Sequence, residues 1–390
     1  MKDQNNSKNQ IEKTNKIVID KKENYIDVFV YQNQKLVEQY KEQFDEQRLE
    51  SNIYLGKVNN VIKGMQAAFI DIGTEKKALI HIKDCIPKES DITGNENADM
   101  SKYSIEKTIK PNQKIIVQIK RDCNKSKGPI VTKDIKLVGK YVILMPFSKF
   151  VTISKKVDDK EERKKLIECV SSFLQGDHFG AIIRTSSVGK NEDIIKSDID
   201  ELIEKWNDIL KKADNTEAPV ELYNNNGIIG KLINDFEPLG VTVSTNSKEI
   251  KEYIEELDKN IEVEIDKTID LEIEQPRKIW LKSGGFITID ITEALVAIDV
   301  NSGKSTAKSG IKSTALEVNY EAVSEIAKQI RLRDLGGIII IDFIDMNEQE
   351  QEKIIQKMQE EIRNDRSKIQ ISEFTKLGLL ELTRKHIFGR

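Results

Sequence analysis

The sequence predicts a multidomain protein of mixed α/β and α+β class, with a small β-barrel in its first half. At 390 residues the chain is long enough for roughly two to four domains. Short β-rich runs that break at Gly56, Gly64 and Gly73 are typical of a small antiparallel barrel. In the last third of the chain strands alternate with long helices, which indicates an α/β domain.

The first third of the chain is predicted to be almost entirely β-structure. Residues 16–43 alternate apolar and polar side chains around polar clusters, which indicates a meander of strands. Residues 51–84 and 114–135 supply the strands of the barrel, which we expect to be of the OB type. The polar stretch between them, residues 88–107, is predicted to be a long barrel loop.

The remainder of the chain mixes strands with helices. The spacing of apolar residues predicts helices at 158–175, 197–214, 248–260, 314–336 and 347–367. Strands are predicted at 138–146, 181–189, 286–291, 294–301 and 336–345. These elements form an α+β section (135–218), a section with one short strand and one helix (219–272) and an α/β section (273–390).

The composition is that of a highly charged globular chain. Hydrophobic residues make up 38% and charged residues 33%, with a formal net charge of −4. A surface coated in basic charge is excluded, whereas a local basic groove is not, because electrostatic attraction fades over about 8 Å. No run approaches the roughly 18 apolar residues of a membrane span, and the polar start is not expected to be a secretory signal. The three cysteines form no CxxC pair, which favours a reducing cytoplasm.

An acidic residue interrupts a strand that is otherwise apolar. In ALVAIDVN, residues 294–301, Asp299 and Asn301 share one face, whereas Ile298 and Val300 share the other. A buried carboxylate is costly unless it is paired, hydrogen-bonded or bound to a metal. Asp299 is therefore expected to have a partner.

A second carboxylate ends the most apolar strand. Four consecutive isoleucines, residues 338–341, predict a strand buried on both faces, which ends in Asp342 with Asp345 three positions on. If this strand neighbours that of Asp299, the two carboxylates come close, because paired strands lie roughly 4.8 Å apart. Two carboxylates and an amide oxygen suit Mg²⁺, which can polarise a phosphodiester. The alternative is that both aspartates only cap turns where strands end.

Several motifs together resemble the ribonuclease E / ribonuclease G family of endoribonucleases. TEALVAIDVNSGKST and RLRDLGGIIIIDFIDM resemble its catalytic signatures. SNIYLGKVNNVIKGMQAAFIDIGTEKKALIHIKD resembles its S1 barrel, AIIRTSSVGK its 5′-sensor motif, and RSKIQISEFTKLGLLELTRK its closing segment. The motifs occur in the family's order and span nearly the whole chain.

The resemblance implies an architecture and a chemistry. It implies a discontinuous, non-catalytic RNase H-like subdomain (1–50 and 219–272), an inserted S1 barrel (51–134), a 5′-sensor region (135–218) and a DNase I-like catalytic subdomain (273–390). By resemblance, Asp299 and Asp342 bind Mg²⁺, and Asn301 orients the site through hydrogen bonds. The family hydrolyses single-stranded RNA to 5′-phosphate and 3′-hydroxyl ends, in RNA decay and rRNA processing.

The barrel is expected to bind RNA. Single-stranded RNA is held by aromatic stacking and cationic tracks, and by resemblance Phe69 stacks a base and Lys127 contacts RNA. The family's second aromatic aligns with Leu79, which is expected to cost about 1 kcal/mol or more of stacking energy. A local basic patch flanks Lys127; it consists of Lys120, Arg121, Lys125, Lys133 and Lys136, set against Asp122 and Asp134.

The resemblance also implies a pocket that senses a 5′-phosphate. Arg184 and Thr185 match the pair that holds this phosphate, and an arginine fork with a hydroxyl suits a phosphate monoester. The positions that line the rest of the pocket correspond to Gly139, Ile143, Lys155 and Lys368. At the last two, lysine replaces the arginine of the best-known members and lacks its planar fork. The preference for a 5′-monophosphate is therefore expected to be weaker than in those members.

Two departures concern assembly and function. No cysteine pair follows the catalytic segment, where the family shares a Zn²⁺ between subunits, so we expect a truncated chain, or a homodimer or tetramer without a zinc link. The size resembles ribonuclease G. The leading hypothesis is a Mg²⁺-dependent endoribonuclease. The alternatives are an RNA-binding protein without catalysis and a phosphodiesterase acting on DNA.

Overall fold

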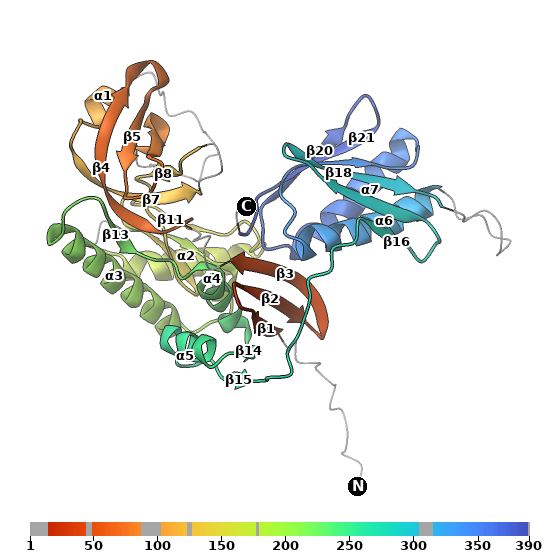
Figure 1. Ribbon diagram of the computed structural model, residues 1–390, viewed down its shortest axis with the longest axis horizontal. Helices are drawn as coiled ribbons and strands as arrows, with labels where there is room; N and C mark the ends of the chain where they lie inside the picture. The colour runs from red at the N-terminus through yellow and green to blue at the C-terminus, as the bar shows by residue number, and fades with distance from the viewer. Residues whose placement is uncertain are drawn as a thin grey trace, which may run out of the picture. The chain divides into compact units, whose positions relative to one another are not determined.

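The computed structural model describes residues 15–43, 49–86, 103–122, 127–176, 179–303 and 315–388. As far as these residues go, the chain forms two compact units. Within these ranges, the first unit takes in residues 15–43 and those from Thr242 to Phe388, and the second takes in the residues from 49 to Val241. Figure 1 shows the elements of both units along the chain.

The first unit contains a five-stranded sheet in the order β15-β14-β1-β2-β3. Strands β1 (Asn15–Lys21), β2 (Tyr25–Gln32) and β3 (Lys35–Gln43) form the antiparallel meander that the sequence predicted. Strands β14 (Val241–Thr245) and β15 (Val263–Ile265) join it in parallel with each other, and α5 (Lys248–Leu257) connects them. Two segments that are distant in the sequence therefore share one sheet.

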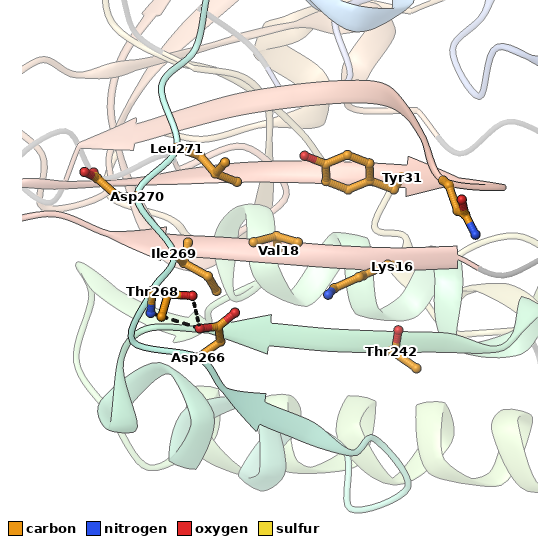
Figure 2. Close-up of a pocket in the computed structure, with 10 residues that line it drawn as sticks. Lys16, Val18, Tyr31, Thr242, Asp266, Thr268, Ile269, Asp270 and Leu271 are labelled. Carbon is orange, nitrogen blue, oxygen red and sulfur yellow. Dashed lines mark hydrogen bonds between the residues drawn. The ribbon is translucent and has the colours of Figure 1, made fainter.

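One face of this sheet is hollowed by a pocket of about 530 Å³. Figure 2 shows its lining, in which Lys16 and Val18 of β1, Tyr31 of β2 and Thr242 of β14 face the segment from Asp266 to Leu271. That segment is held by Asp266, whose carboxylate accepts hydrogen bonds from the backbone and the hydroxyl of Thr268. These bonds lower the pKa of Asp266.

The first unit also contains a six-stranded sheet in the order β16-β17-β18-β19-β21-β20. Its first four strands are β16 (Lys278–Trp280), β17 (Phe286–Ile291), β18 (Leu295–Asn301) and β19 (Gly337–Asp342). The other two are β20 (Ile369–Phe374) and β21 (Leu379–Arg384). Only β18 and β19 pair in parallel, and α6 (Ala315–Leu332) provides the crossover between them.

Helices α6 and α7 (Glu348–Glu361) cover one face of this six-stranded sheet (Figure 1). The core beneath them includes Ile298, Val323 and Ile341, all at most 1% exposed. On the opposite face side chains reach solvent, and Ile338 is 50% exposed. The expectation that residues 338–341 are buried on both faces is therefore wrong, because helices pack against a single face.

The second unit contains a closed barrel of five strands, in which β4 pairs with both β5 and β7. The strands are β4 (Ile53–Ile62), β5 (Ala67–Asp71), β6 (Ala78–His81), β7 (Lys114–Arg121) and β8 (Ile130–Thr132). This OB-like closure confirms the barrel. Most of the predicted loop 88–107 lies outside the described residues, and within it α1 (Ile105–Thr108) forms one helical turn.

An α+β section follows the barrel and shares a hydrophobic core with it. Its sheet has the order β11-β12-β10-β9, with strands at Val151–Ile153, Gly180–Ile183, Val142–Met145 and Leu137–Val138. Two long helices, α2 (Lys160–Phe173) and α3 (Glu192–Asp214), pack on it. Both helices were predicted. Helix α3 begins at Glu192, ahead of its predicted start at 197, and Asn191 caps its N-terminus.

The structure assigns residues 219–241 to a different part of the chain from the one that the sequence predicted. The interpretation placed all of 219–272 with residues 1–50, whereas the structure places the part up to Val241 in the second unit. The reason is that β13 (Val220–Tyr223) pairs with barrel strand β4, and α4 (Gly227–Phe236), a helix that the sequence analysis missed, belongs to the same unit. Across the described residues, none of the helices has the length and apolar character needed to cross a bilayer.

Candidate functional site

The two aspartates lie side by side on neighbouring parallel strands. Asp299 of β18 is in register with Asp342 of β19. Residues in register on adjacent strands point to the same face, roughly 4.8 Å apart along the hydrogen-bonding direction. The closeness that the sequence predicted for this pair is confirmed.

Both carboxylates lie on the open face of the sheet, away from α6 and α7. Asp299 and Asp342 are exposed, whereas Ile298, Val300 and Ile341 are buried on the helix-covered face. Asp299 is therefore not the buried acid that the apolar strand suggested. Because the two carboxylates are exposed, they need no partner to offset the cost of burial. Their oxygens are accessible to a ligand.

Asn301 lies on the same face and contacts Asp299 directly. Its Nδ2–H donates a hydrogen bond to Oδ2 of Asp299. The bond holds one carboxylate oxygen in place and leaves the amide oxygen of Asn301 available. Asp345 follows β19 in an exposed position.

A tight hairpin fixes the end of the strand that carries Asn301. Gly303 has a φ of +58°, and a Cβ added there would lie 2.2 Å from the backbone oxygen of Gly284. Only glycine accommodates both this backbone and this approach. Glu321 of α6 accepts hydrogen bonds from the backbone N–H groups of Lys282 and Ser283 at 2.5 and 2.9 Å. Burial raises the pKa of Glu321, but the side chain and backbone N–H of Ser283 and the backbone N–H of Lys282 outweigh it and lower the pKa.

The donor set fits a hard divalent cation that keeps part of its water. Among the described residues, no group of three or more His, Cys, Asp or Glu side chains gathers as a metal site. Mg²⁺ is commonly held by one or two carboxylates together with waters and substrate phosphates. Asp299, Asp342 and the Asn301 oxygen supply that kind of incomplete, open set.

Phe69 lies on the surface of the barrel, in a hollow lined by basic residues. It belongs to β5, is half-buried, and is the cross-strand partner of Leu79. The hollow has a volume of about 480 Å³, and its lining consists of Asn59, Asn60, Phe69, Lys76, Lys77 and Gly128. Phe69 is therefore no core residue, which removes the plainest alternative to a role in binding.

Lys127 and Arg121 are both exposed, and Lys127 directly precedes Gly128, which lines the hollow. A Cβ at Gly128 would lie 2.2 Å from the backbone oxygen of Lys77, so the chain directly after Lys127 passes close to the Lys77 backbone. Arg121 ends β7 opposite Ile130 of β8. Ile130 is in turn paired with Leu79, and Leu79 with Phe69, so Arg121 and Phe69 belong to one row of the barrel with two strands between them.

The rest of the predicted basic patch is partly neutralised. Lys120 pairs with Asp84 at 2.6 Å, and Lys136 pairs with Asp134 at 3.4 Å. Lys133 is half-buried, and Lys125 lies outside the described residues. The patch is therefore less cationic than its sequence suggests.

Arg184 already has partners within its own unit. Its guanidinium donates to the backbone oxygens of Gly139 and Asn234 at 2.5 and 3.2 Å, and to the carboxylate of Asp235. Asp235 belongs to α4, so sequence reasoning, which missed that helix, also missed this ion pair. A phosphate at Arg184 would compete with Asp235.

The remaining sensor candidates divide between the two units. Thr185 follows Arg184 in the chain and is exposed; Gly139 precedes β10, Ile143 lies within it, and Lys155 is exposed after β11. Asp198 of α3 holds the turn before β10, because its carboxylate accepts the backbone N–H groups of residues 140–142. Lys368 is exposed just before β20 and belongs to the first unit.

Fold and site together define a protein that joins an OB-like barrel to a paired-carboxylate centre on an open α/β sheet. Comparison with known proteins gives the family. The sequence profile described as "Ribonuclease E/G family" matches residues 136–387. The chain belongs to the ribonuclease E/G family.

Individual relatives agree with this assignment. The chain is 32% identical over 360 residues to Ribonuclease G of Escherichia coli (strain K12), which covers 86% of this chain and 72% of the relative. Identity is 34% over 358 residues with Ribonuclease E of Nostoc sp., covering 86% of this chain and 51% of the relative. With Ribonuclease E of Buchnera aphidicola it is 36% over 358 residues, covering 86% and 37%.

Proposed function

We propose that the protein is a Mg²⁺-dependent endoribonuclease that hydrolyses single-stranded RNA to 5′-phosphate and 3′-hydroxyl ends. The observation that carries this proposal is the register of Asp299 with Asp342 on an open sheet face, in a chain of the ribonuclease E/G family. The DNase I-like catalytic subdomain would be residues 273–390. Its RNA substrates would be mRNA and rRNA precursors, encountered in the cytoplasm.

The residues of the centre have separate roles in this chemistry. Asp299 and Asp342 would hold Mg²⁺, which when bound polarises the phosphodiester and stabilises the charge that develops on it. The Asn301 N–H keeps the Asp299 carboxylate in one orientation. Glu321 and the Gly284–Gly303 contact hold the hairpin and the strand end, so the carboxylates are positioned before RNA arrives.

The second unit would supply RNA binding and selection of the 5′ end. We assign residues 51–134 as an S1 barrel, in which Phe69 stacks a base and Lys127 and Arg121 contact phosphates. Residues 135–218 would be the 5′-sensor region, with Arg184 and Thr185 binding a terminal monophosphate. Because Asp235 already pairs with Arg184, and Lys155 and Lys368 lack the arginine fork, the preference for a 5′-monophosphate is expected to be modest.

Two parts of the proposal concern the remaining sequence. Residues 1–50, together with the part of 219–272 that follows Val241, would form an RNase H-like, non-catalytic subdomain, built on the sheet of β1–β3 with β14 and β15. The proposed assembly is a homodimer or a tetramer.

The test uses one short sequence in three chemical forms: RNA with a 5′-monophosphate, RNA with a 5′-hydroxyl, and DNA. With Mg²⁺, we expect internal cleavage of both RNAs and no cleavage of the DNA. The Asp299→Ala, Asp342→Ala double variant should abolish cleavage. Asp290→Asn is the matched control, because Asp290 is a carboxylate on neighbouring strand β17 that pairs with Arg277 instead.

The outcomes separate the candidate functions. Cleavage of DNA alone, or cleavage that survives in the double variant, contradicts the proposal. RNA binding without cleavage by the wild-type protein would favour the second candidate, an RNA-binding protein without catalysis. That candidate is supported by the half-buried position of Phe69 at the barrel surface and by its basic surroundings, which need no metal centre.

A further inference from the structure

An exposed aromatic cluster lies on the open face of the sheet, beside the paired carboxylates. Trp280 of β16 is 63% exposed, although tryptophan is usually mostly buried. It packs edge-to-face on Phe286 of β17, with ring centroids 5.2 Å apart. The Lys278 ammonium lies 4.1 Å from the Trp280 centroid and 3.6 Å from the Phe286 centroid.

Strand register ties this cluster to the site. Trp280 is paired with Phe286, and Phe286 with Asn301, so the three side chains form a row across β16, β17 and β18. In the adjacent row, Lys278 is paired with Thr288, and Thr288 with Asp299. Since neighbouring strands are roughly 4.8 Å apart, Trp280 lies about 10 Å along the face from Asn301.

Packing alone does not explain why these side chains face solvent. The hydrophobic core of this sheet lies on its other face, under α6 and α7. Along β17, Ile287 and Ile289 point into that core, whereas Phe286 and Thr288 point away from it. The sequence therefore places two aromatic rings and a lysine on the same face as the carboxylates.

We propose that Trp280, with Phe286 and Lys278, is a stacking platform for an unpaired nucleobase of the RNA, within two nucleotides of the scissile phosphate. This inference rests on the proposed function and names a substrate contact for it. Aromatic rings stack with any base, and a lysine beside them provides charge for the neighbouring phosphate. The platform positions the strand over the carboxylates, and its preference is for unpaired bases.

A second copy of this chain is the competing occupant of an exposed apolar cluster. The chemistry of the face favours RNA, because charged and polar groups surround the two rings: Lys278, Thr288, Asn301 and Asp299. The cores of protein interfaces are instead depleted in charged residues, and lysine is among those depleted there.

Tryptophan fluorescence offers a direct test, because the chain has two tryptophans. Trp206 is buried in the other unit, so Trp206→Phe leaves Trp280 as the single reporter. This substitution is combined with Asp299→Ala and Asp342→Ala to prevent turnover. Binding of single-stranded RNA should quench the remaining emission, whereas the same RNA annealed into a duplex should quench it much less.

Cleavage kinetics with abasic substrates provide the second readout. In a protein with intact carboxylates, Trp280→Ala should lower kcat/KM roughly tenfold, within the range for loss of one stacked base, and Trp280→Tyr should restore most of it. Removing one base within two nucleotides of the cleaved bond should cost the wild type a similar factor. The same removal should cost Trp280→Ala almost nothing, because the two changes delete one contact.

The control variant is Leu377→Ala, since Leu377 is 86% exposed in the turn between β20 and β21 of the same sheet. It should leave kcat/KM unchanged. Cleavage that is normal in Trp280→Ala, with no quenching by RNA, overturns the platform and leaves the proposed function standing. A change in dimerisation instead, with cleavage unaffected, overturns it too and assigns the cluster to a second copy. Absence of RNA cleavage by the wild type contradicts the proposed function itself.

Discussion

At the scale of single residues, the centre depends on how a few side chains are held. Asp299 and Asp342 are adjacent because their strands are in register, and Asn301 bonds one of them. The sequence showed that Asp299 and Asn301 alternate with the apolar residues Ile298 and Val300. It did not show that the two aspartates are exposed, because their exposure depends on which face of the sheet the helices cover.

Gly303 tests the contact that fixes the end of β18. Gly303→Ala should lower the free energy of unfolding of the first unit by about 3 kcal/mol, because it combines a positive φ with a backbone clash at Gly284. Gly378→Ala is the control: its φ is +82°, but open space surrounds it, so a loss of about 1 kcal/mol is expected. Denaturant unfolding measures the free energy of unfolding of both variants. Equal losses in the two would show that the clash at Gly284 does not contribute.

A substitution at Arg184 tests its proposed role in binding the 5′-monophosphate of the RNA. Arg184→Gln should bring the ratio of cleavage rates on 5′-monophosphate and 5′-hydroxyl RNA close to one, and leave the 5′-hydroxyl rate largely intact. Arg163→Gln is the control, since Arg163 also donates to two backbone oxygens of the second unit, those of Ser154 and Val157. A ratio that is unchanged in Arg184→Gln would show that this arginine only supports the fold.

At the scale of elements, a buried ionic cluster joins the two sheets of the first unit. Glu38 of β3 accepts hydrogen bonds from Arg331 of α6, from Arg366 ahead of β20, and from the Tyr40 hydroxyl. Burial raises the pKa of Glu38, but Arg366, Arg331 and Tyr40 outweigh it and lower the pKa to about 2. The charged carboxylate is therefore the form that the folded state requires.

Acid should weaken this contact over a defined range. A carboxyl whose folded pKa is depressed stabilises the fold above its unfolded pKa of about 4.3 and loses that contribution as the pH falls toward the folded value. Stability should thus decline between about pH 4.5 and 2. Glu38→Gln should lose about 3 kcal/mol at pH 7, since two largely buried arginines lose their counter-charge, and should show a flatter decline with acid.

Thermal unfolding at pH 7 and pH 3 measures both effects. Glu264→Gln, an exposed carboxylate on β15 of the same sheet, should behave like the wild type at both values. If Glu38→Gln unfolds with the wild-type pH dependence, Glu38 is not the group whose protonation weakens the fold.

The elements that the sequence analysis missed explain where it failed. Strands β20 and β21 were not predicted, although they complete the sheet beside Asp342. Helix α4 was missed as well, and with it the pairing of Asp235 with Arg184, which are distant in the sequence. Such contacts are tertiary, so the local periodicity of either segment does not encode them.

At the scale of the whole molecule, two compact units carry different parts of the proposed function. The carboxylate pair belongs to the first unit, and Phe69, Lys127 and Arg184 belong to the second. The order of β-rich and α/β sections was predictable from the sequence. The grouping of 219–272 was not, because β13 pairs with β4, a strand from a distant part of the chain.

The phosphate contacts proposed for the second unit predict that the affinity for RNA depends on salt concentration. Removing one phosphate contact reduces the slope of log affinity against log salt by about 0.7 for single strands. The Arg121→Ala, Lys127→Ala double variant should therefore reduce the slope by about 1.4, relative to the wild type. Lys120→Ala should change it less, because Lys120 already pairs with Asp84. Affinity of the wild type that is flat in salt would exclude a cationic track.

The most direct measurement is a titration of Mg²⁺ against the rate of single-stranded RNA cleavage, for wild type, Asp299→Asn, Asp342→Asn and Asp290→Asn. If Asp299 and Asp342 hold the metal, each of their variants requires far more Mg²⁺ for half-maximal rate or shows no cleavage at any concentration. Asp290→Asn should follow the wild-type curve. Unchanged Mg²⁺ dependence in Asp299→Asn and Asp342→Asn would contradict the central claim that these two carboxylates form the metal site.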